Sequence, residues 1–187
     1  MYTLSGVTTM RGAATVSVER WGADHAVTQM YAAHYTSLVR LAGLLVRHSG
    51  EAEEIVQDAF VAMHGRWRQL REPDKALAYL RRSVVNGARS TQRHHVVSDK
   101  HLSKHVDDVR RHAPSAEQQT LTAETRQEVL AALHRLPQRQ REVLVLRYYS
   151  DLAEADIADA LGISRGAVKS HASRGISSLR ANLEDFR

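Results

Sequence analysis

Apolar residues recur at intervals of three and four along most of this chain, and this periodicity limits most strongly what it can fold into. In the segment 27–45 the recurring positions are Val27, Met30, Tyr31, Leu38, Leu41 and Leu45. This spacing places them on one face of an α-helix. No segment of the sequence combines sustained strand alternation with hairpin turn residues. The pattern therefore predicts an all-α protein.

Two helical blocks are separated by a segment that lacks this periodicity. We expect residues 25–95 and residues 120–187 to form two small helical domains. Residues 96–119 are polar and His-rich and contain Pro114, which is typical of a flexible linker. Residues 1–24 are expected to be a disordered leader, in which Met10 is an alternative start to Met1. Within the first block, residues 65–74 are expected to form a loop.

The composition excludes several classes of protein. The chain has no cysteine, which excludes a disulfide scaffold, a thiolate zinc site and a cysteine nucleophile. Its net charge of +5 suggests an anionic partner without identifying it. No apolar run approaches the length that spans a membrane, and residues 1–20 lack the apolar block of a secretory signal. We therefore expect a cytoplasmic protein that does not insert into a membrane.

The second block carries the spacing of a helix-turn-helix. Ile157, Ala158 and Leu161 fit one short amphipathic helix, after which Gly162 suits a left-handed turn and Ser164 suits a helix N-cap. We therefore predict a helix-turn-helix in the C-terminal domain. The residues of its last helix that are expected to face the core are Val168, Ala172, Ile176, Leu179 and Leu183.

The other face of this last helix is cationic, because no acidic residue occurs from Ser164 to Asn182. Such a helix fits the major groove of DNA, where its cations would neutralise phosphates. Lys169, His171 and Arg174 could reach base edges there. An ordinary solvated helix end is the alternative.

A second cationic face is predicted in the first block. Arg82, Asn86, Arg89 and Arg93 recur at i, i+4, i+7 and i+11, so they share one side of a helix. The amide of Asn86 is suited to reading a base. The neighbouring aromatic residues Trp67 and Tyr79 could stack on unpaired bases, although we favour core packing for both rings.

The segment that precedes this second cationic face is acidic. No Lys or Arg occurs between Gly50 and Arg66, whereas Glu51, Glu53, Glu54 and Asp58 carry negative charge. Such a face would repel DNA, and it fits either a protein partner or a plain solvated surface.

Three segments together resemble the extracytoplasmic-function group of bacterial sigma factors, in a SigE-like branch. Residues 52–60 (AEEIVQDAF) resemble the segment that binds the clamp helices of RNA polymerase. Residues 79–86 (YLRRSVVN) look like the helix that recognises the promoter −10 element, and residues 136–179 are similar to the domain that binds the −35 element. The resemblance covers roughly residues 25–183 and implies an alternative sigma factor that directs promoter-specific initiation of transcription.

The resemblance also implies roles for individual residues and partners. Core RNA polymerase would be contacted by Glu54, Gln57 and Asp58. The −10 element would be contacted by Arg82, Asn86, Arg89 and Arg93, with an unstacked base held between Asn86 and the loop 70–74. The −35 element would be contacted by Arg165, Lys169, Ser170, His171 and Arg174. The partners implied are core RNA polymerase and promoter DNA, and in many members of the group an anti-sigma factor.

Two other functional classes are weaker hypotheses. A stand-alone transcriptional regulator would use the helix-turn-helix alone, but it leaves the acidic segment and the Asn86 face unexplained. An enzyme is not expected, because neither a glycine-rich phosphate loop nor a nucleophile motif is present. The histidines His94, His95, His101, His105 and His112 invite a metal-site hypothesis. We expect them to be solvated linker side chains, and we expect neither a cofactor, a metal nor a catalytic residue.

Overall fold

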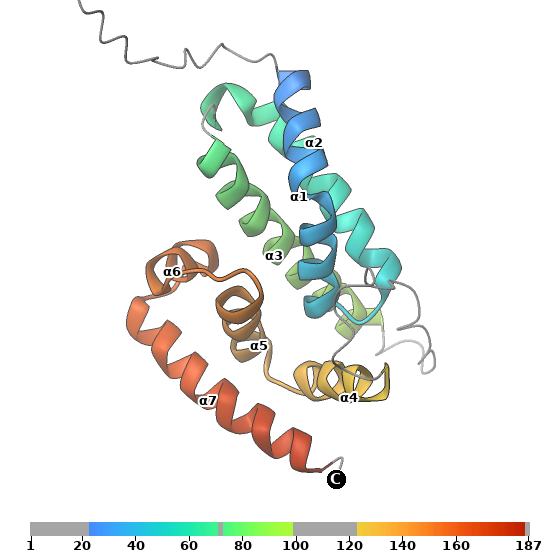
Figure 1. The fold of residues 1–187 in the computed structure, drawn as a ribbon, viewed down its shortest axis with the longest axis vertical. Helices are drawn as coiled ribbons and strands as arrows, with labels where there is room; N and C mark the ends of the chain where they lie inside the picture. The colour runs from blue at the N-terminus through green and yellow to red at the C-terminus, as the bar shows by residue number, and fades with distance from the viewer. Residues whose placement is uncertain (1–22, 71–72, 99–122, 186–187) are drawn as a thin grey trace, which may run out of the picture.

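The structure, a computed structural model, describes residues 23–70, 73–98 and 123–185, and within them every regular element is a helix (Figure 1). The first helical group consists of α1 (Ala23–Leu45), α2 (Ser49–Leu70) and α3 (Pro73–Ser98). The second group consists of α4 (Ala123–His134), α5 (Gln138–Leu144), the π-helical turn η1 (Val145–Tyr149), α6 (Glu154–Leu161) and α7 (Arg165–Glu184). The predicted all-α architecture with two small helical groups is confirmed. None of the described helices is long and apolar enough to cross a membrane.

Helices α1, α2 and α3 pack around a shared apolar core. Leu41 of α1, Met63 of α2 and Leu80 of α3 are almost completely buried in it. Gly87 lets α2 and α3 approach closely, because a Cβ atom at this position would lie 2.7 Å from Cγ2 of Ile55. The apolar periodicity of the sequence therefore predicted most of the core of this group, but Tyr31, on the expected apolar face of α1, is 43% exposed.

The predicted loop at residues 65–74 is wrong. Helix α2 continues to Leu70 and α3 begins at Pro73, so only residues 71–72 separate the two helices. The physical reason is that Trp67 and Leu70 pack against the core, and this burial outweighs the low helix propensity of Gly65. Proline is also well suited to the first position of a helix.

The helices also extend beyond the predicted domain boundaries. Helix α1 already begins at Ala23, inside the predicted leader, and α3 runs to Ser98, inside the predicted linker. The remaining residues of those two predicted segments, 1–22 and 99–119, lie outside the described residues. The division into leader, domains and linker therefore stays a prediction.

The second group is built around a short central helix. Pro137 precedes α5, and the apolar side chains of Val143 and Leu146 are fully buried. Helix α7 packs closely against α5 at Gly175, where a Cβ atom would lie 3.1 Å from Cδ1 of Leu144. Figure 1 shows α7 on the side of α5 and α6 that faces away from α3.

One histidine in this group is held in its neutral form. Burial lowers the pKa of His134 to about 4, and the nearby cations Arg141 and Arg47 act in the same direction. The Arg141 guanidinium also donates a hydrogen bond to the carbonyl oxygen of His134, 3.1 Å away. Arg47 lies just after α1, so the pKa of His134 is lowered by positive charges from both helical groups.

The two groups lie against each other, and their buried apolar residues form one continuous core. The most extensive contacts between the groups join α3 to α6, α1 to α4 and α1 to η1. The Tyr149 hydroxyl of η1 donates a hydrogen bond to the carbonyl oxygen of Ser37 on α1, 3.2 Å away. The sequence predicted two domains but gave no indication of this packing.

Candidate functional site

The predicted helix-turn-helix is present in the second group. Helix α6 ends at Gly162, which has the left-handed φ and ψ angles of 64° and 42°. Ser164 then caps α7, since its side-chain oxygen accepts a hydrogen bond from the Ala167 backbone N–H at 3.1 Å. Ile157 of α6 and Val168 of α7 are fully buried, and they fix the angle between the two helices from inside. Both local signals, the glycine and the cap, act as predicted.

The cationic face of α7 is open to solvent. Arg165, Lys169, Ser170 and Arg174 are exposed, and His171 is half-buried beside them. Arg174 donates from Nε to the carbonyl oxygen of Ser170, 3.2 Å away on the preceding turn. The Lys169 ammonium lies 3.8 Å from the Glu154 carboxylate, a distance that leaves it only weakly engaged. The five residues predicted to bind the −35 element therefore lie together on one accessible helix.

The second half of α7 differs from the prediction. Ile176 was expected in the core, but it is 39% exposed, and Leu179 and Leu183 are only half-buried. These residues line a surface groove together with Arg180 and Glu184. The last turns of α7 contact α4, where the Asn182 side chain donates to the Ala132 carbonyl oxygen at 3.0 Å. In the described part of the chain, no further helix covers this side of α7.

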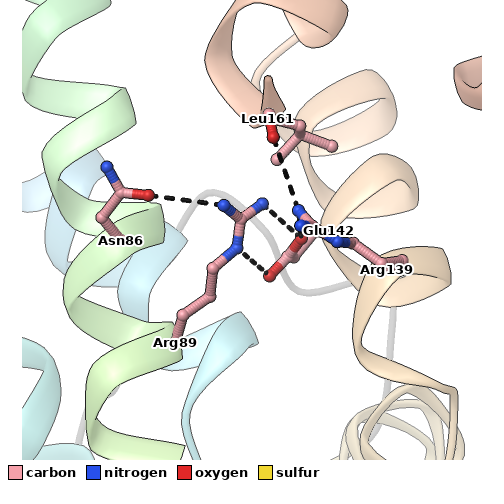
Figure 2. A network of polar contacts seen from close by, with 5 residues as sticks. All are labelled: Asn86, Arg89, Arg139, Glu142 and Leu161. Atoms are coloured by element: carbon pink, nitrogen blue, oxygen red, sulfur yellow. Dashed lines mark hydrogen bonds and ion pairs between the residues drawn. The ribbon is translucent and has the colours of Figure 1, made fainter. Parts of the chain in front are cut away.

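The predicted −10 face lies on α3, and one of its four residues is already engaged. Arg82, Asn86 and Arg93 are exposed, whereas the Arg89 side chain is only 18% exposed. Arg89 donates from Nε and Nη2 to the two carboxylate oxygens of Glu142 on α5, each 2.7 Å away. Figure 2 shows this pair together with Asn86, whose side-chain oxygen lies 3.4 Å from Arg89 Nη1.

Glu142, which engages a residue of the predicted −10 face, was not singled out by the sequence. Its carboxylate also accepts a hydrogen bond from Arg139 at 3.2 Å, and Arg139 in turn lies 3.5 Å from the Leu161 carbonyl oxygen of α6 (Figure 2). Glu142 is 53 residues from Arg89 in the sequence. No local pattern marks it, because its role arises only when α5 packs beside α3.

The two aromatic residues near the −10 face are partly used in packing. Trp67 and Tyr79 are half-buried against the core of the first group. The guanidinium carbon of Arg66 lies 5.8 Å from the centre of the Tyr79 ring, within the range of a cation–π contact. Their stacking on unpaired bases stays a prediction.

The acidic face of α2 borders the same groove as Asn86. Glu54, Gln57 and Asp58 are all exposed on α2. Glu54 and Asp58 line a groove between α2 and α3, which Asn86 and His94 line from the other side. The predicted polymerase-binding and −10-binding residues are therefore neighbours in space, a relationship that their separate sequence motifs did not reveal.

A cluster that could hold a metal ion lies near the end of α3. His48, Glu51 and His95 each bring a potential ligand atom to within 4.8 Å of the others. Sequence reasoning associated His95 with the histidines that follow it and did not connect it with His48 or Glu51.

Comparison with known families accounts for both helical groups. Residues 30–96 match Sigma-70 region 2, and residues 126–179 match Sigma-70, region 4. The first match contains α2, almost all of α3 and most of α1, and the second contains all of α6 and most of α7, the two helices of the helix-turn-helix.

Relatives that match most of the chain are also named as RNA polymerase sigma factors. The RNA polymerase sigma-E factor of Streptomyces avermitilis is 33% identical over 152 residues, which is 79% of each chain. The ECF RNA polymerase sigma factor SigM of Mycobacterium tuberculosis is 33% identical over 153 residues, covering 82% of this chain and 74% of its own.

Solved structures share the fold. The sigma factor RpoE of Bartonella quintana, solved with the anti-sigma factor NepR, is 24% identical with a TM-score of 0.64, covering 86% of this chain and 98% of its own. CnrH, solved with the cytosolic domain of CnrY, is 22% identical with a TM-score of 0.60, covering 90% of this chain and 98% of its own.

Proposed function

The chain belongs to the sigma-70 family of RNA polymerase sigma factors, in the extracytoplasmic-function group, and on this premise we propose that α7 and α3 are its two promoter-binding helices. The protein is an alternative sigma factor that binds core RNA polymerase and directs promoter-specific initiation of transcription. The observation that carries the residue assignment is the exposed cationic face of α7 on a complete helix-turn-helix.

We propose that α7 reads the −35 element. Arg165 stands at the first position of the helix, and Lys169 and Arg174 follow on its exposed side, so their charges can neutralise phosphates on both sides of a major groove. Arg174, Lys169 and His171 are the side chains long enough to reach base edges from there. Ser170 contributes a hydroxyl that can donate to or accept from either phosphate or base.

We propose that α3 binds the −10 element through Arg82, Asn86, Arg89 and Arg93. The exposed amide of Asn86 at the edge of the groove between α2 and α3 is suited to hold an unstacked base by hydrogen bonds. Unstacking one base costs a few kcal/mol, roughly, and such contacts offset it. Arg89 can join this face only after it releases Glu142, because the carboxylate occupies two of its donors.

It follows that the packed arrangement of the two groups is one in which the −10 face is incomplete. We propose that binding to polymerase and promoter separates α5 from α3 and frees Arg89. The connection of about 24 residues between α3 and α4 would reach roughly 80 Å if it were fully extended, which exceeds the ~34 Å length of one turn of DNA. The length of the chain therefore permits both helices to bind separate promoter elements.

The exposed carboxylates of α2 are proposed to contact core RNA polymerase. Glu54, Gln57 and Asp58 lie on one accessible side of this helix, and negative charge there disfavours contact with DNA. Their closeness to Asn86 across the groove would place the polymerase next to the unstacked −10 base.

Three further properties are proposed on the same premise. The protein acts by binding, without a catalytic step of its own, and it works in the cytoplasm, where its polymerase partner is found. An anti-sigma factor is proposed as a third partner, because RpoE of Bartonella quintana shares the fold and was solved with the anti-sigma factor NepR.

The experiment that tests the proposal is run-off transcription on a promoter library, with core polymerase in the presence and absence of the purified chain. Transcripts that depend on the chain and share −10 and −35 sequences are expected. Gel-shift assays with and without core enzyme separate this function from that of a stand-alone regulator, which would bind its operator equally well without polymerase. DNA binding that is equally strong with and without core enzyme, together with no transcript that depends on core enzyme, would contradict the promoter-binding assignment.

A further inference from the structure

We propose that His48, Glu51 and His95 form a binding site for a divalent transition-metal ion such as zinc. The proposal does not depend on which residues bind the promoter. Three side chains with metal-ligating atoms, two from the start of α2 and the bend before it and one from the end of α3, bring those atoms to within 4.8 Å of one another.

The three residues are held in place by packed helices. His48 lies in the bend between α1 and α2, Glu51 lies in the first turn of α2, and His95 lies in the last turn of α3. The Gln92 side chain donates to the Leu45 carbonyl oxygen at 2.6 Å, which ties the end of α3 to the end of α1 beside the cluster. A site built on fixed helix ends keeps its ligands close together before an ion arrives.

The side chains in the cluster face one another. Nε2 of His95 is paired with Oε1 of Glu51. The rings of His48 and His95 have their centres 5.5 Å apart, with 56° between their planes. The Glu51 side chain is 20% exposed and that of His95 is 45% exposed, so an ion could enter from solvent while the carboxylate remains partly desolvated.

One polar atom of the cluster has no partner among the described residues. Oε2 of Glu51 is buried, and nothing in the described part of the chain donates a hydrogen bond to it. A buried carboxylate oxygen without a donor is unfavourable, and a bound cation satisfies it. A simple ion pair between Glu51 and His95 would provide a partner for Oε1 of Glu51. It would leave Oε2 without one, and it would not account for the position of the His48 ring beside the pair.

The donor set selects the class of metal. Two imidazoles and one carboxylate suit zinc and similar first-row ions, whereas magnesium and calcium prefer oxygen ligands throughout. Zinc binds such ligands at about 2.0–2.2 Å and completes a tetrahedral site with a fourth ligand, here water. Small side-chain rotations would bring the three atoms into this geometry from their present separation.

A bound ion would join the bend after α1 and the first turn of α2 to the last turn of α3. Because the ligands come from separate segments, the site exists only in the folded chain, and metal binding therefore stabilises that fold. The site also lies at the end of the helix that carries Asn86, Arg89 and Arg93.

The test uses the full chain, purified without a histidine tag, and zinc chloride in equilibrium dialysis. We expect one zinc ion per chain and a higher thermal unfolding temperature in its presence. In Glu51→Gln, which preserves the shape of the side chain but removes the charged ligand, zinc affinity should fall by more than about 10-fold, the scale on which even outer-shell changes act. His48→Ala and His95→Ala should have the same effect, and circular dichroism should show that their helix content is unchanged.

Two control variants distinguish this site from the other histidines. His94→Ala changes the exposed neighbour of His95, and the double variant His101→Ala/His105→Ala changes the histidines that follow α3. Both should keep the zinc affinity of the unmodified chain. Cobalt(II) in place of zinc should give the intense visible bands of a tetrahedral site in the control variants and lose them in Glu51→Gln. Absence of stoichiometric zinc, or loss of zinc only in the control variants, would overturn the proposal.

Discussion

The Arg89 guanidinium and the Glu142 carboxylate form a two-point ion pair, with both nitrogen–oxygen distances 2.7 Å, that joins the two helical groups of the protein. The Glu142 side chain is only 3% exposed, so the pair is largely removed from solvent. A buried carboxylate that loses its cation is strongly destabilised. The same contact withholds Arg89 from the predicted −10 face, so the stability of the packed form and the availability of that face are coupled.

The variant Glu142→Gln should open the packed arrangement. An amide cannot accept two charge-assisted hydrogen bonds from Arg89, and we expect the free energy of unfolding to fall by roughly 3 kcal/mol, the scale of breaking a buried pair. The free chain should expand in small-angle X-ray scattering and bind a single-stranded −10 oligonucleotide more tightly.

Arg139→Gln is the matched control, because Arg139 contacts the same carboxylate but is 43% exposed and should contribute less than 1 kcal/mol, roughly. Unchanged scattering and unchanged oligonucleotide binding in Glu142→Gln would contradict the coupling.

Removal of the Arg174 side chain should weaken recognition of the −35 element. Loss of one side chain that contacts a base typically lowers affinity by about 1–3 kcal/mol. Run-off transcription from a −35-dependent promoter should fall accordingly in Arg174→Ala, while affinity for core polymerase stays the same. Arg180→Ala removes another exposed arginine from the far end of α7 and should leave transcription unchanged. Equal loss of promoter and polymerase binding in Arg174→Ala would show that the assignment of α7 is wrong.

Charge reversal on α2 should weaken polymerase binding and leave −35 binding unchanged, which is the reverse of the effect expected for Arg174→Ala. In Asp58→Lys, affinity for core polymerase should decrease, because the variant places a cation in the proposed docking face. Binding of the α7 face to a −35 duplex should not change. Asp159→Lys makes the same substitution at an exposed position of α6 and serves as the control in a fluorescence titration against core enzyme. Equal polymerase affinities for the two variants would argue against a role for α2.

The close approach of α2 and α3 at Gly87 can be tested without any functional assay. A Cβ atom there would lie 2.7 Å from Cγ2 of Ile55, so Gly87→Ala should lower the free energy of unfolding by about 1–3 kcal/mol, as overpacked core positions do. Gly43→Ala is the matched control within α1, because a Cβ atom at that position meets nothing within 4 Å. There alanine should stabilise the helix by roughly 0.5–1 kcal/mol. Urea unfolding of both variants is compared with that of Ile55→Ala, which lacks both Cγ atoms, with and without Gly87→Ala. If the contact limits stability, Gly87→Ala should cost less in the Ile55→Ala chain than in the unmodified chain, and an equal cost in the two would contradict it.

The helix-turn-helix could be predicted from the sequence because its signals are local. The left-handed turn at Gly162 and the cap at Ser164 depend on the residues immediately around them, and the structure has both. The burial of Ile157 and Val168 follows from helical periodicity in the same way. Exposure of the α7, α3 and α2 side chains was also predictable for most positions, because charged residues rarely tolerate burial.

The remaining features depend on contacts between distant segments. Residues 65–70 are helical because Trp67 and Leu70 reach a core that the local sequence does not reveal. Ile176 is 39% exposed, and which side of α7 its neighbours cover depends on tertiary packing that helical periodicity does not encode. The pairing of Arg89 with Glu142 joins residues 53 positions apart, and periodicity carries no information on which helix faces which.

Stability should depend on pH through His134. Its pKa is lowered to about 4 in the folded chain, mainly by burial, whereas an exposed histidine has a pKa near 6.5. Between these two values the unfolded chain binds a proton that the folded chain does not, so folding stability decreases as the pH falls from about 6.5 towards 4. After allowance for partial exposure, the loss is on the order of 2 kcal/mol. Urea unfolding at pH 7.5 and pH 5 should show it in the unmodified chain and not in His134→Gln, which keeps the backbone carbonyl that Arg141 binds. Other titrating groups are common to both proteins and cancel in the comparison, so the same pH dependence in the two would show that His134 is not held neutral by the fold.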